Sequence, residues 1–180
     1  MLGTTCATKK SALTSNTASA RRTASSSCSD STQTRSLRAA KAAFFELATA
    51  AKPWLLKAGA AGRLVGVSSF VAHAFARGLM TFPASAAAKA GVEAFAKAFA
   101  VDIAGSGATV NCVAPGFIEK DPDAHAAVPR AGMENVNQSI PMGRYGKPAE
   151  VAALIAFLAS DAARGYHGAC IAIDKGITAG

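Results

Sequence analysis

Two hydroxyl side chains and one lysine are spaced so that they could form a reactive site. Ser85 and Lys89 are four residues apart, so on a helix their side chains share one face. Ser69 follows one apolar run, and Pro115–Gly116 follows another. A serine hydroxyl beside a lysine can act as a nucleophile in acyl transfer, with Lys89 paired to either serine. No oxyanion-binding motif accompanies the pair, so this chemistry stays a minor alternative.

The segments around these residues alternate between strand and helix patterns. Short apolar runs predict buried strands, and longer runs with helical spacing of apolar residues predict helices. The strands are expected at residues 63–68, 108–113 and 169–174, and the helices at residues 37–57, 84–104 and 149–159. Alternation of this kind predicts parallel strands in a three-layer α/β sheet. Because the carboxyl ends of parallel strands meet at one edge, Ser69, Lys89 and the Pro115–Gly116 bend should converge on one crevice.

Several segments occur in an order known from one enzyme family. They are residues 62–70 (GRLVGVSSF), 85–95 (SAAAKAGVEAF) and 110–121 (VNCVAPGFIEKD), followed by 141–151 (PMGRYGKPAEV) and 169–176 (ACIAIDKG). Together they resemble the catalytic half of the short-chain dehydrogenase/reductase family, from Leu37 to the carboxyl terminus. The resemblance implies an α/β fold with a partial Rossmann-like, doubly wound parallel sheet of about three strands with flanking helices.

The resemblance also implies a function and a set of site residues. The family uses NAD or NADP to oxidise a hydroxyl or reduce a carbonyl group of a small molecule. By position, Ser69 would polarise the substrate carbonyl, and Lys89 would hold the nicotinamide ribose. The remaining roles would fall to Pro115, Gly116 and Ile118 at the nicotinamide, and to Phe117 and His73 at the substrate.

This sequence departs from the family pattern at Ser85, which stands where the family has its catalytic tyrosine. A phenol has a pKa of about 10, whereas an alkyl hydroxyl is closer to water at about 15.7. The difference corresponds to roughly 7 kcal/mol for proton transfer, so Ser85 should be a poor general acid or base.

A second departure concerns the dinucleotide phosphates. No Gly-x-x-x-Gly-x-Gly loop precedes Ser69, although such a loop cradles the pyrophosphate at a helix amino terminus. The sequence therefore predicts a truncated family member. The alternative function is an inactive family fragment with a structural or oligomerisation role. In either case a homo-oligomer is expected through the helices at 37–57 and 84–104.

Each candidate residue also has a purely structural interpretation. Ser68 and Ser69 could cap a turn, and Ser85 could be the N-cap or a first-turn residue of its helix. Lys89 could be a solvated lysine paired with Glu93 four residues on. His73 could be an ordinary surface loop residue.

Residues 1–36 differ from the rest of the chain. They are rich in Ser, Thr and Arg and nearly free of large apolar residues, which predicts a disordered tail before a domain at 37–180. A tail of this composition also fits an organelle transit peptide; otherwise the protein is expected in the cytoplasm.

The remaining composition excludes several classes of function. The net charge is +8, but much of it lies in the first 40 residues, so nucleic-acid binding by the folded part is not indicated. No apolar run reaches the roughly 18 residues of a membrane span. The four cysteines are Cys6, Cys28, Cys112 and Cys170, and their spacing matches no zinc motif. Cys112 and Cys170 lie in apolar strand-like runs, which predicts reduced core cysteines, and no metal site is expected.

Overall fold

The computed structural model describes residues 43–75, 81–120 and 136–179. Contacts divide the chain into two units, Met1–Gln33 and Thr34–Gly180, and every described residue belongs to the second. The predicted tail at 1–36 lies outside the described residues. Within them, no helix combines the length and apolarity needed to cross a bilayer.

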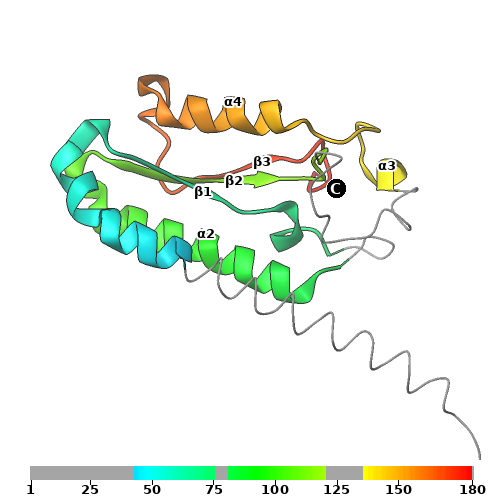
Figure 1. Ribbon diagram of the computed structural model, residues 1–180, viewed down its shortest axis with the longest axis horizontal. Helices are drawn as coiled ribbons and strands as arrows, with labels where there is room; N and C mark the ends of the chain where they lie inside the picture. Colours follow the sequence, from blue (N-terminus) through cyan, green and yellow to red (C-terminus); the bar gives the residue numbers. More distant parts are fainter. Residues whose placement is uncertain (1–42, 76–80, 121–135, 180) are drawn as a thin grey trace, which may run out of the picture. The chain divides into compact units, whose positions relative to one another are not determined.

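The centre of the second unit is a three-stranded parallel sheet (Figure 1). Its strands are β1 (Arg63–Val67), β2 (Thr109–Pro115) and β3 (Cys170–Ile173), in the order β1-β2-β3. In the register, Cys112 pairs with Gly66 on one side and with Cys170 on the other. The predicted α/β class, parallel pairing and strand count are confirmed.

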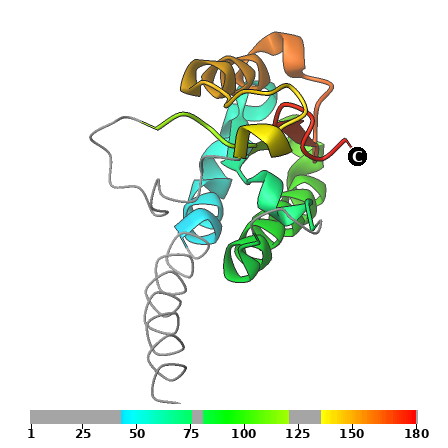
Figure 2. The ribbon, with the colours of Figure 1, turned by 90° about the vertical axis from the view of Figure 1, so that its right-hand side faces the viewer.

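Helices cover both faces of this sheet. The helix at residues 43–58 and helix α2 (Pro83–Ile103) pack on one face, and α4 (Pro148–Ala159) packs on the other. Figure 2, turned by 90°, shows α2 and α4 on opposite sides of the strands. The remaining elements are a short helix α3 (Val136–Ser139) and four 3₁₀ turns: η1 (Gly59–Ala61), η2 (Phe70–Ala72), η3 (Ala104–Ser106) and η4 (Asp161–Ala163).

Local sequence explains where the two main helices begin. Pro83 and Pro148 occupy first helical positions, where the missing N–H of proline has no bond to lose. At α4 the Glu150 carboxylate accepts from the Lys147 backbone N–H at 2.7 Å, which satisfies one unpaired donor at the helix start. The predicted helix at 84–104 is shifted by one residue, to Pro83–Ile103. The predicted strand at 108–113 is found at Thr109–Pro115, because pairing with β3 carries β2 on to Pro115.

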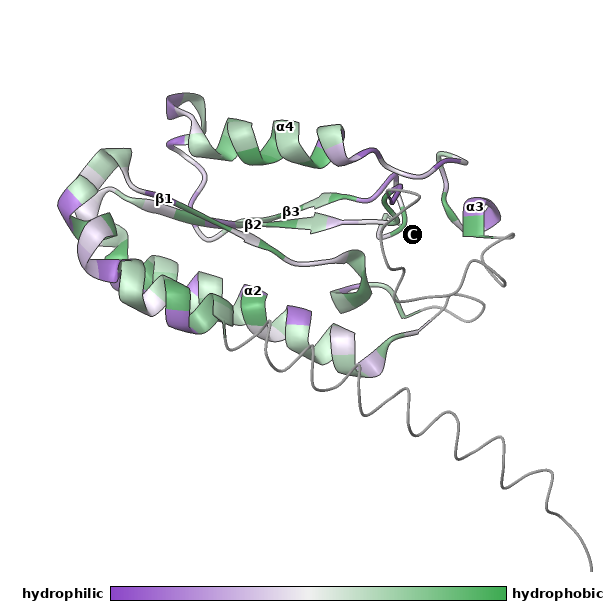
Figure 3. Cartoon of the chain, in the orientation of Figure 1, coloured by the Kyte–Doolittle hydropathy of each residue, from purple (hydrophilic) through white to green (hydrophobic). Residues whose placement is uncertain are grey.

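Each face of the sheet has its own apolar core, visible as hydrophobic colouring along α2 and α4 (Figure 3). The α2 face joins side chains from both of its helices and from the strands: Ala48, Leu55, Val92, Ala96, Phe99, Ala100, Ile103, Ala108, Val110 and Cys112. The α4 face is centred on Val113, Leu158 and Ala163, with Val65, Val151, Leu154, Ile155 and Ile171 packed against them.

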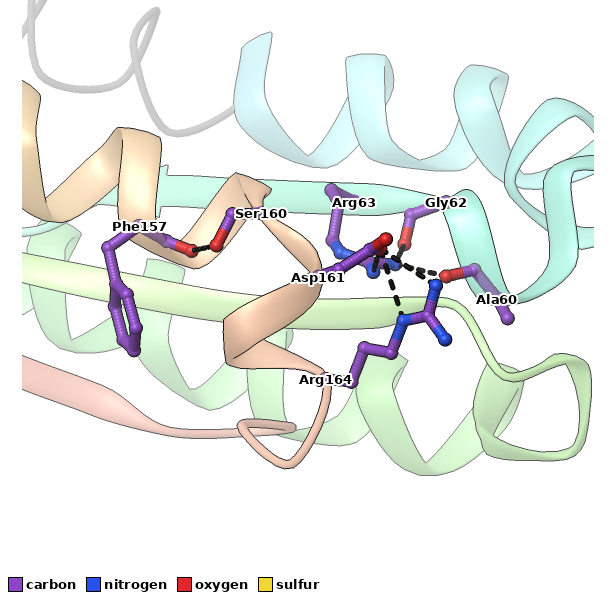
Figure 4. Close-up of polar contacts among 7 residues, drawn as sticks. All are labelled: Ala60, Gly62, Arg63, Phe157, Ser160, Asp161 and Arg164. Atoms are coloured by element: carbon purple, nitrogen blue, oxygen red, sulfur yellow. Dashed lines mark hydrogen bonds and ion pairs between the residues drawn. The ribbon is translucent and has the colours of Figure 1, made fainter.

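At the amino-terminal end of the strands, Arg63 at the start of β1 joins neighbouring segments by hydrogen bonds. Its guanidinium donates to the carbonyls of Ala60 at 2.6 Å and Gly62 at 2.9 Å. It also reaches Asp161 of η4 at 3.3 Å, and Arg164 donates to the same carboxylate (Figure 4). These bonds tie η1, β1 and η4 together at the end of the sheet opposite the candidate site.

Candidate active site

The loops that follow β1 and β2 meet at the carboxyl edge of the sheet. The Ser68 N–H donates to the Val113 carbonyl at 2.8 Å, so β1 stays paired with β2 up to the residue before Ser69. Beyond the strands, the rings of Phe70 and Phe117 lie 4.6 Å apart between centroids. The structure therefore brings the segments of Ser69 and of Pro115–Gly116 into contact, as their strand-end positions predict.

Lys89 reaches this edge from α2. Its ammonium donates to the carbonyl of Val67, the last residue of β1, at 2.8 Å. Burial lowers the pKa of Lys89. An ammonium has three donors, and within residues 43–75, 81–120 and 136–179 the Val67 carbonyl is its one acceptor. The interpretation of Lys89 as a partner of Glu93 is wrong in this structure, because Lys89 bonds to the strand end and Glu93 bonds to other side chains.

Ser69 has an extended backbone and stands immediately before η2. Its side-chain oxygen accepts from the Val71 N–H at 3.4 Å, so the turn-capping interpretation describes its present contact. As an acceptor in that bond, the hydroxyl keeps its own proton available to donate to a substrate oxygen. Capping and a role at the substrate are therefore compatible.

Ser85 is the third residue of α2, one turn before Lys89. The N-cap position is held by Phe82, and Pro83 follows it. The interpretation of Ser85 as a first-turn residue is confirmed, and its interpretation as the N-cap is wrong. Its side chain is partly buried.

The bend after β2 is fixed by a close approach at Gly116. A Cβ there would lie 2.7 Å from Cα of Asp174, so no larger residue fits without moving the backbone. Gly116 donates to the Ile173 carbonyl at 3.2 Å, and Ile118 forms a parallel bridge with Gly146. The predicted cofactor positions Pro115, Gly116 and Ile118 thus form one ordered loop over the ends of β2 and β3.

Phe117 lies in this loop between two other aromatic side chains. It contacts Phe70 and, with ring centroids 6.1 Å apart, Tyr145. Tyr166 packs against Phe157 of α4 instead. Of the two tyrosines, Tyr145 is therefore the one that shares a loop contact with the candidate site.

A polar cluster that sequence reasoning missed lies beside these residues. Ser68 Oγ donates to Oε1 of Glu93, and His73 Nε2 lies 2.9 Å from the same oxygen. The predicted substrate residue His73 thus turns its ring nitrogen toward α2. The sequence held one signal for this cluster. Glu93 is an acidic residue directly after the apolar Val92, on the face of α2 that packs against the sheet.

An apolar pocket adjoins the candidate site. Its volume is about 510 Å³, within the range of small-molecule sites. It is lined by Val71, Ala74, Phe75, Thr81, Phe82, Pro83, Ala86, Ala87 and Ala90. Ser69, Ser85 and Lys89 do not line it, but Ala86 follows Ser85 directly, and the Val71 backbone N–H donates to the Ser69 hydroxyl.

The chain is similar in sequence to known enzymes. The family model for enoyl-(acyl carrier protein) reductase matches residues 8–178. The 3-oxoacyl-[acyl-carrier-protein] reductase FabG of Pseudomonas aeruginosa is 39% identical over 116 residues, which are 64% of this chain and 45% of that protein. The chain thus spans less than half the length of this relative.

Solved structures resemble the same part of the chain. The crystal structure of a short chain dehydrogenase from Bacillus anthracis matches with a TM-score of 0.59 and 34% identity, covering 74% of this chain and 49% of that one. A blue fluorescent protein from a metagenomic library, in complex with NADPH, matches with a TM-score of 0.56 and 28% identity, covering 65% and 45%.

Proposed function

Because this chain belongs to the short-chain dehydrogenase/reductase family, we propose that it carries the catalytic half of an NAD(P)-dependent oxidoreductase. The reaction is the transfer of a hydride between the nicotinamide and a carbonyl or hydroxyl carbon of a small molecule. The observation that carries the proposal is the meeting of three segments at the carboxyl edge of the sheet. Lys89 bonds to the last strand residue before Ser68–Ser69, and Phe70 packs on Phe117 beside the Pro115–Gly116 bend.

The residues at this edge fit the nicotinamide end of a dinucleotide. Gly116 allows the loop to approach Asp174 closely at the strand ends, and Lys89, whose one acceptor among the described residues is the Val67 carbonyl, keeps donors for ribose hydroxyls. NAD or NADP supplies the hydride chemistry when bound. Pro115 and Ile118 would contact the nicotinamide ring from the same loop.

Ser69 and Ser85 are the two hydroxyl groups expected to contact the substrate. Ser69 would donate its free hydroxyl proton as a hydrogen bond to the carbonyl oxygen, which stabilises the negative charge that develops there. Ser85 lies one turn before Lys89, but its hydroxyl is a weak proton donor compared with a phenol. We therefore expect slow proton transfer and a low turnover rate in this chain.

The adjoining pocket suggests the class of substrate. The lining residues that the structure describes are almost wholly apolar, and Phe75 and Phe82 contribute aromatic surface. This favours a carbonyl compound with an apolar chain, in line with the 3-oxoacyl substrate in the name of the Pseudomonas aeruginosa relative. His73 and Phe117 would lie at the polar end of such a substrate.

Cofactor binding is the first test. NADPH and NADH are titrated into the full chain, and nicotinamide fluorescence is followed for the parent, for Lys89→Met and for Lys57→Met. Lys57 is a matched control, because it is exposed and precedes β1 at the opposite edge of the sheet. We expect saturable binding by the parent and by Lys57→Met, and weaker binding by Lys89→Met. Equal binding by all three variants contradicts the role of Lys89, and no binding by any of them contradicts the oxidoreductase proposal.

The second candidate function is a non-catalytic family member with a structural role, which the serine at position 85 favours. In support, large apolar side chains stand exposed on the two helices of the α2 face, with Leu47 68%, Trp54 71% and Val101 80% exposed. We propose self-association through these helices. Size-exclusion chromatography with light scattering should show a dimer or larger species that Trp54→Glu dissociates; a parent that runs as a monomer contradicts this proposal.

A further inference from the structure

Three side chains with different metal-binding atoms lie close together next to Ser68, the residue before Ser69 of the candidate site. They are His73 at the end of η2, Glu93 in the middle of α2 and Cys170 at the start of β3. One ligand atom from each lies within 4.8 Å of the other two. The three residues are far apart in the sequence, so no short spacing motif could predict that they meet.

This set of atoms suits a borderline-soft divalent ion. Imidazole nitrogen, carboxylate oxygen and thiolate sulfur all bind Zn²⁺, and three protein ligands with one open position are typical of zinc sites that keep a bound water. A carboxylate and a thiolate also balance the two positive charges of the ion, so the occupied site would be neutral. Neutrality matters because the Glu93 side chain is only 7% exposed.

We propose that His73, Glu93 and Cys170 form a binding site for a divalent transition metal ion, with zinc as the preferred ion. Ser68 is the supporting residue, since its hydroxyl donates to Glu93 and orients the carboxylate. Its ligands are not among the proposed cofactor residues Pro115, Gly116 and Ile118, and it requires no dinucleotide; with the ion bound, His73 is a metal ligand and not a substrate contact.

The present geometry is close to what the ion needs. With bonds of about 2.0 to 2.3 Å and tetrahedral angles, ligand atoms lie about 3.3 to 3.6 Å apart. Nε2 of His73 and Oε1 of Glu93 are 2.9 Å apart and must separate slightly, and the Cys170 sulfur already lies within 4.8 Å of both. Side-chain rotation alone can supply shifts of this size. The His73 side chain is 39% exposed, so an ion can enter from solvent.

The thiol of Cys170 must lose its proton for the ion to bind. Burial, the Glu93 charge and hydrogen bond and the neighbouring Cys112 together raise the pKa of Cys170 to about 12, with burial the largest cause and Lys97 opposing them. A divalent cation reverses this balance, because its charge favours the thiolate. Metal binding should therefore release one proton from the thiol.

Cobalt(II) spectroscopy tests the sulfur ligand directly, because a thiolate bound to Co²⁺ gives a near-ultraviolet charge-transfer band. The full chain is used with Cys6→Ser and Cys28→Ser as the background, so that only Cys112 and Cys170 remain. We expect the band in this background with one Co²⁺ per chain, its loss in Cys170→Ser, and its retention in Cys112→Ser. Cys112 is a matched control, because it is the strand neighbour of Cys170 in the register. Absence of the band from the background, its survival in Cys170→Ser, or its loss in Cys112→Ser overturns the proposal.

Zinc-dependent melting tests the other ligands and does not rely on colour. Zinc chloride should raise the melting temperature of the same background, because an ion bound only to the native state stabilises it. The increase should vanish in His73→Asn and in Glu93→Gln. It should persist in His167→Asn, since His167 bonds to the Ala100 carbonyl and lies outside the site. An equal zinc-dependent increase in His73→Asn overturns the assignment of His73 as a ligand.

Discussion

The two faces of the sheet are packed in different ways. On the α4 face, Val113, Leu158 and Ala163 are fully buried, and the buried Asn111 bonds to the backbone of Tyr166 and Ala169. On the α2 face, apolar packing is interrupted by Glu93, whose partners are side chains. A polar group bonded to backbone holds two segments together, whereas one bonded to side chains can exchange its partners. The α4 face is therefore built for stability, and the α2 face holds the groups available for chemistry.

Truncation of Leu158 should have the largest effect on stability. The side chain is 0% exposed in the core of the α4 face, so Leu158→Ala removes buried surface and leaves a cavity. We expect a loss of about 2 to 5 kcal/mol in the free energy of unfolding, measured by urea denaturation. The matched control is Leu47→Ala, which deletes the same atoms from a side chain that is 68% exposed and should change stability by less than about 0.5 kcal/mol. Similar losses in both variants contradict the close packing of the α4 face.

Asn111→Leu should have the next largest effect. The amide donates to the Tyr166 carbonyl at 2.8 Å and accepts from the Ala169 N–H at 3.1 Å. Leucine has a similar volume but leaves both backbone groups without these bonds, which should cost about 2 kcal/mol or more. On the α2 face, Glu93→Gln keeps an acceptor for Ser68 and should cost less. A larger loss for Glu93→Gln than for Asn111→Leu, in the same urea assay, reverses the proposed division between the two faces.

Alkaline pH should weaken the α2 face through its two thiols. Burial is the largest cause that raises the pKa of Cys112 to about 11 and of Cys170 to about 12, both above the ordinary value of 9.0. Between pH 9 and about 11, the unfolded chain releases these protons while the native chain keeps them. The unfolded state then binds fewer protons, so stability is complete below pH 9 and falls as the pH rises through this window.

Thermal melts across this window check the effect of the thiols. The parent is compared with the double variant Cys112→Ala/Cys170→Ala, which isolates the contribution of the two thiols. The melting temperature of the parent should fall more steeply with pH than that of the variant. Parallel pH profiles contradict the contribution of the thiols.

The sequence predicted the fold better than it predicted the site. The three strands are short apolar runs whose type does not depend on distant residues, and Pro83 and Pro148 mark helix starts locally. The carboxyl-edge position of Ser69 follows from the parallel topology, so it could be predicted as well. The catalytic and binding roles of Ser69, Lys89, Ser85, Pro115, Gly116, Ile118, Phe117 and His73 remain predictions.

The cluster around Glu93 could not be predicted, for a physical reason. Glu93 and Lys89 are four residues apart, and the helical rule favours a local ion pair between them. The chain instead places Lys89 against the end of β1 and Glu93 against Ser68 and His73. Tertiary partners supplied by β1 and η2 displace the local pair, and periodicity within one helix carries no information about them.

The smallest effect should come from the ion pair that links the two helices of the α2 face. Lys52 and Asp102 lie 2.6 Å apart, but their side chains are 36% and 52% exposed, so water screens the attraction and competes for both charges. A double-mutant cycle with Lys52→Met and Asp102→Asn should give a coupling energy of about 0.2 to 1 kcal/mol. Added salt should reduce this coupling, since the screening of exposed charges strengthens as ionic strength rises. The rings of Phe44 and Phe45 also join the helix at 43–58 to α2 by packing on Phe95, so Phe95→Ala should cost more than the ion pair. A coupling energy that exceeds the cost of Phe95→Ala, in the same urea assay, would mean that charge rather than aromatic packing joins the two helices.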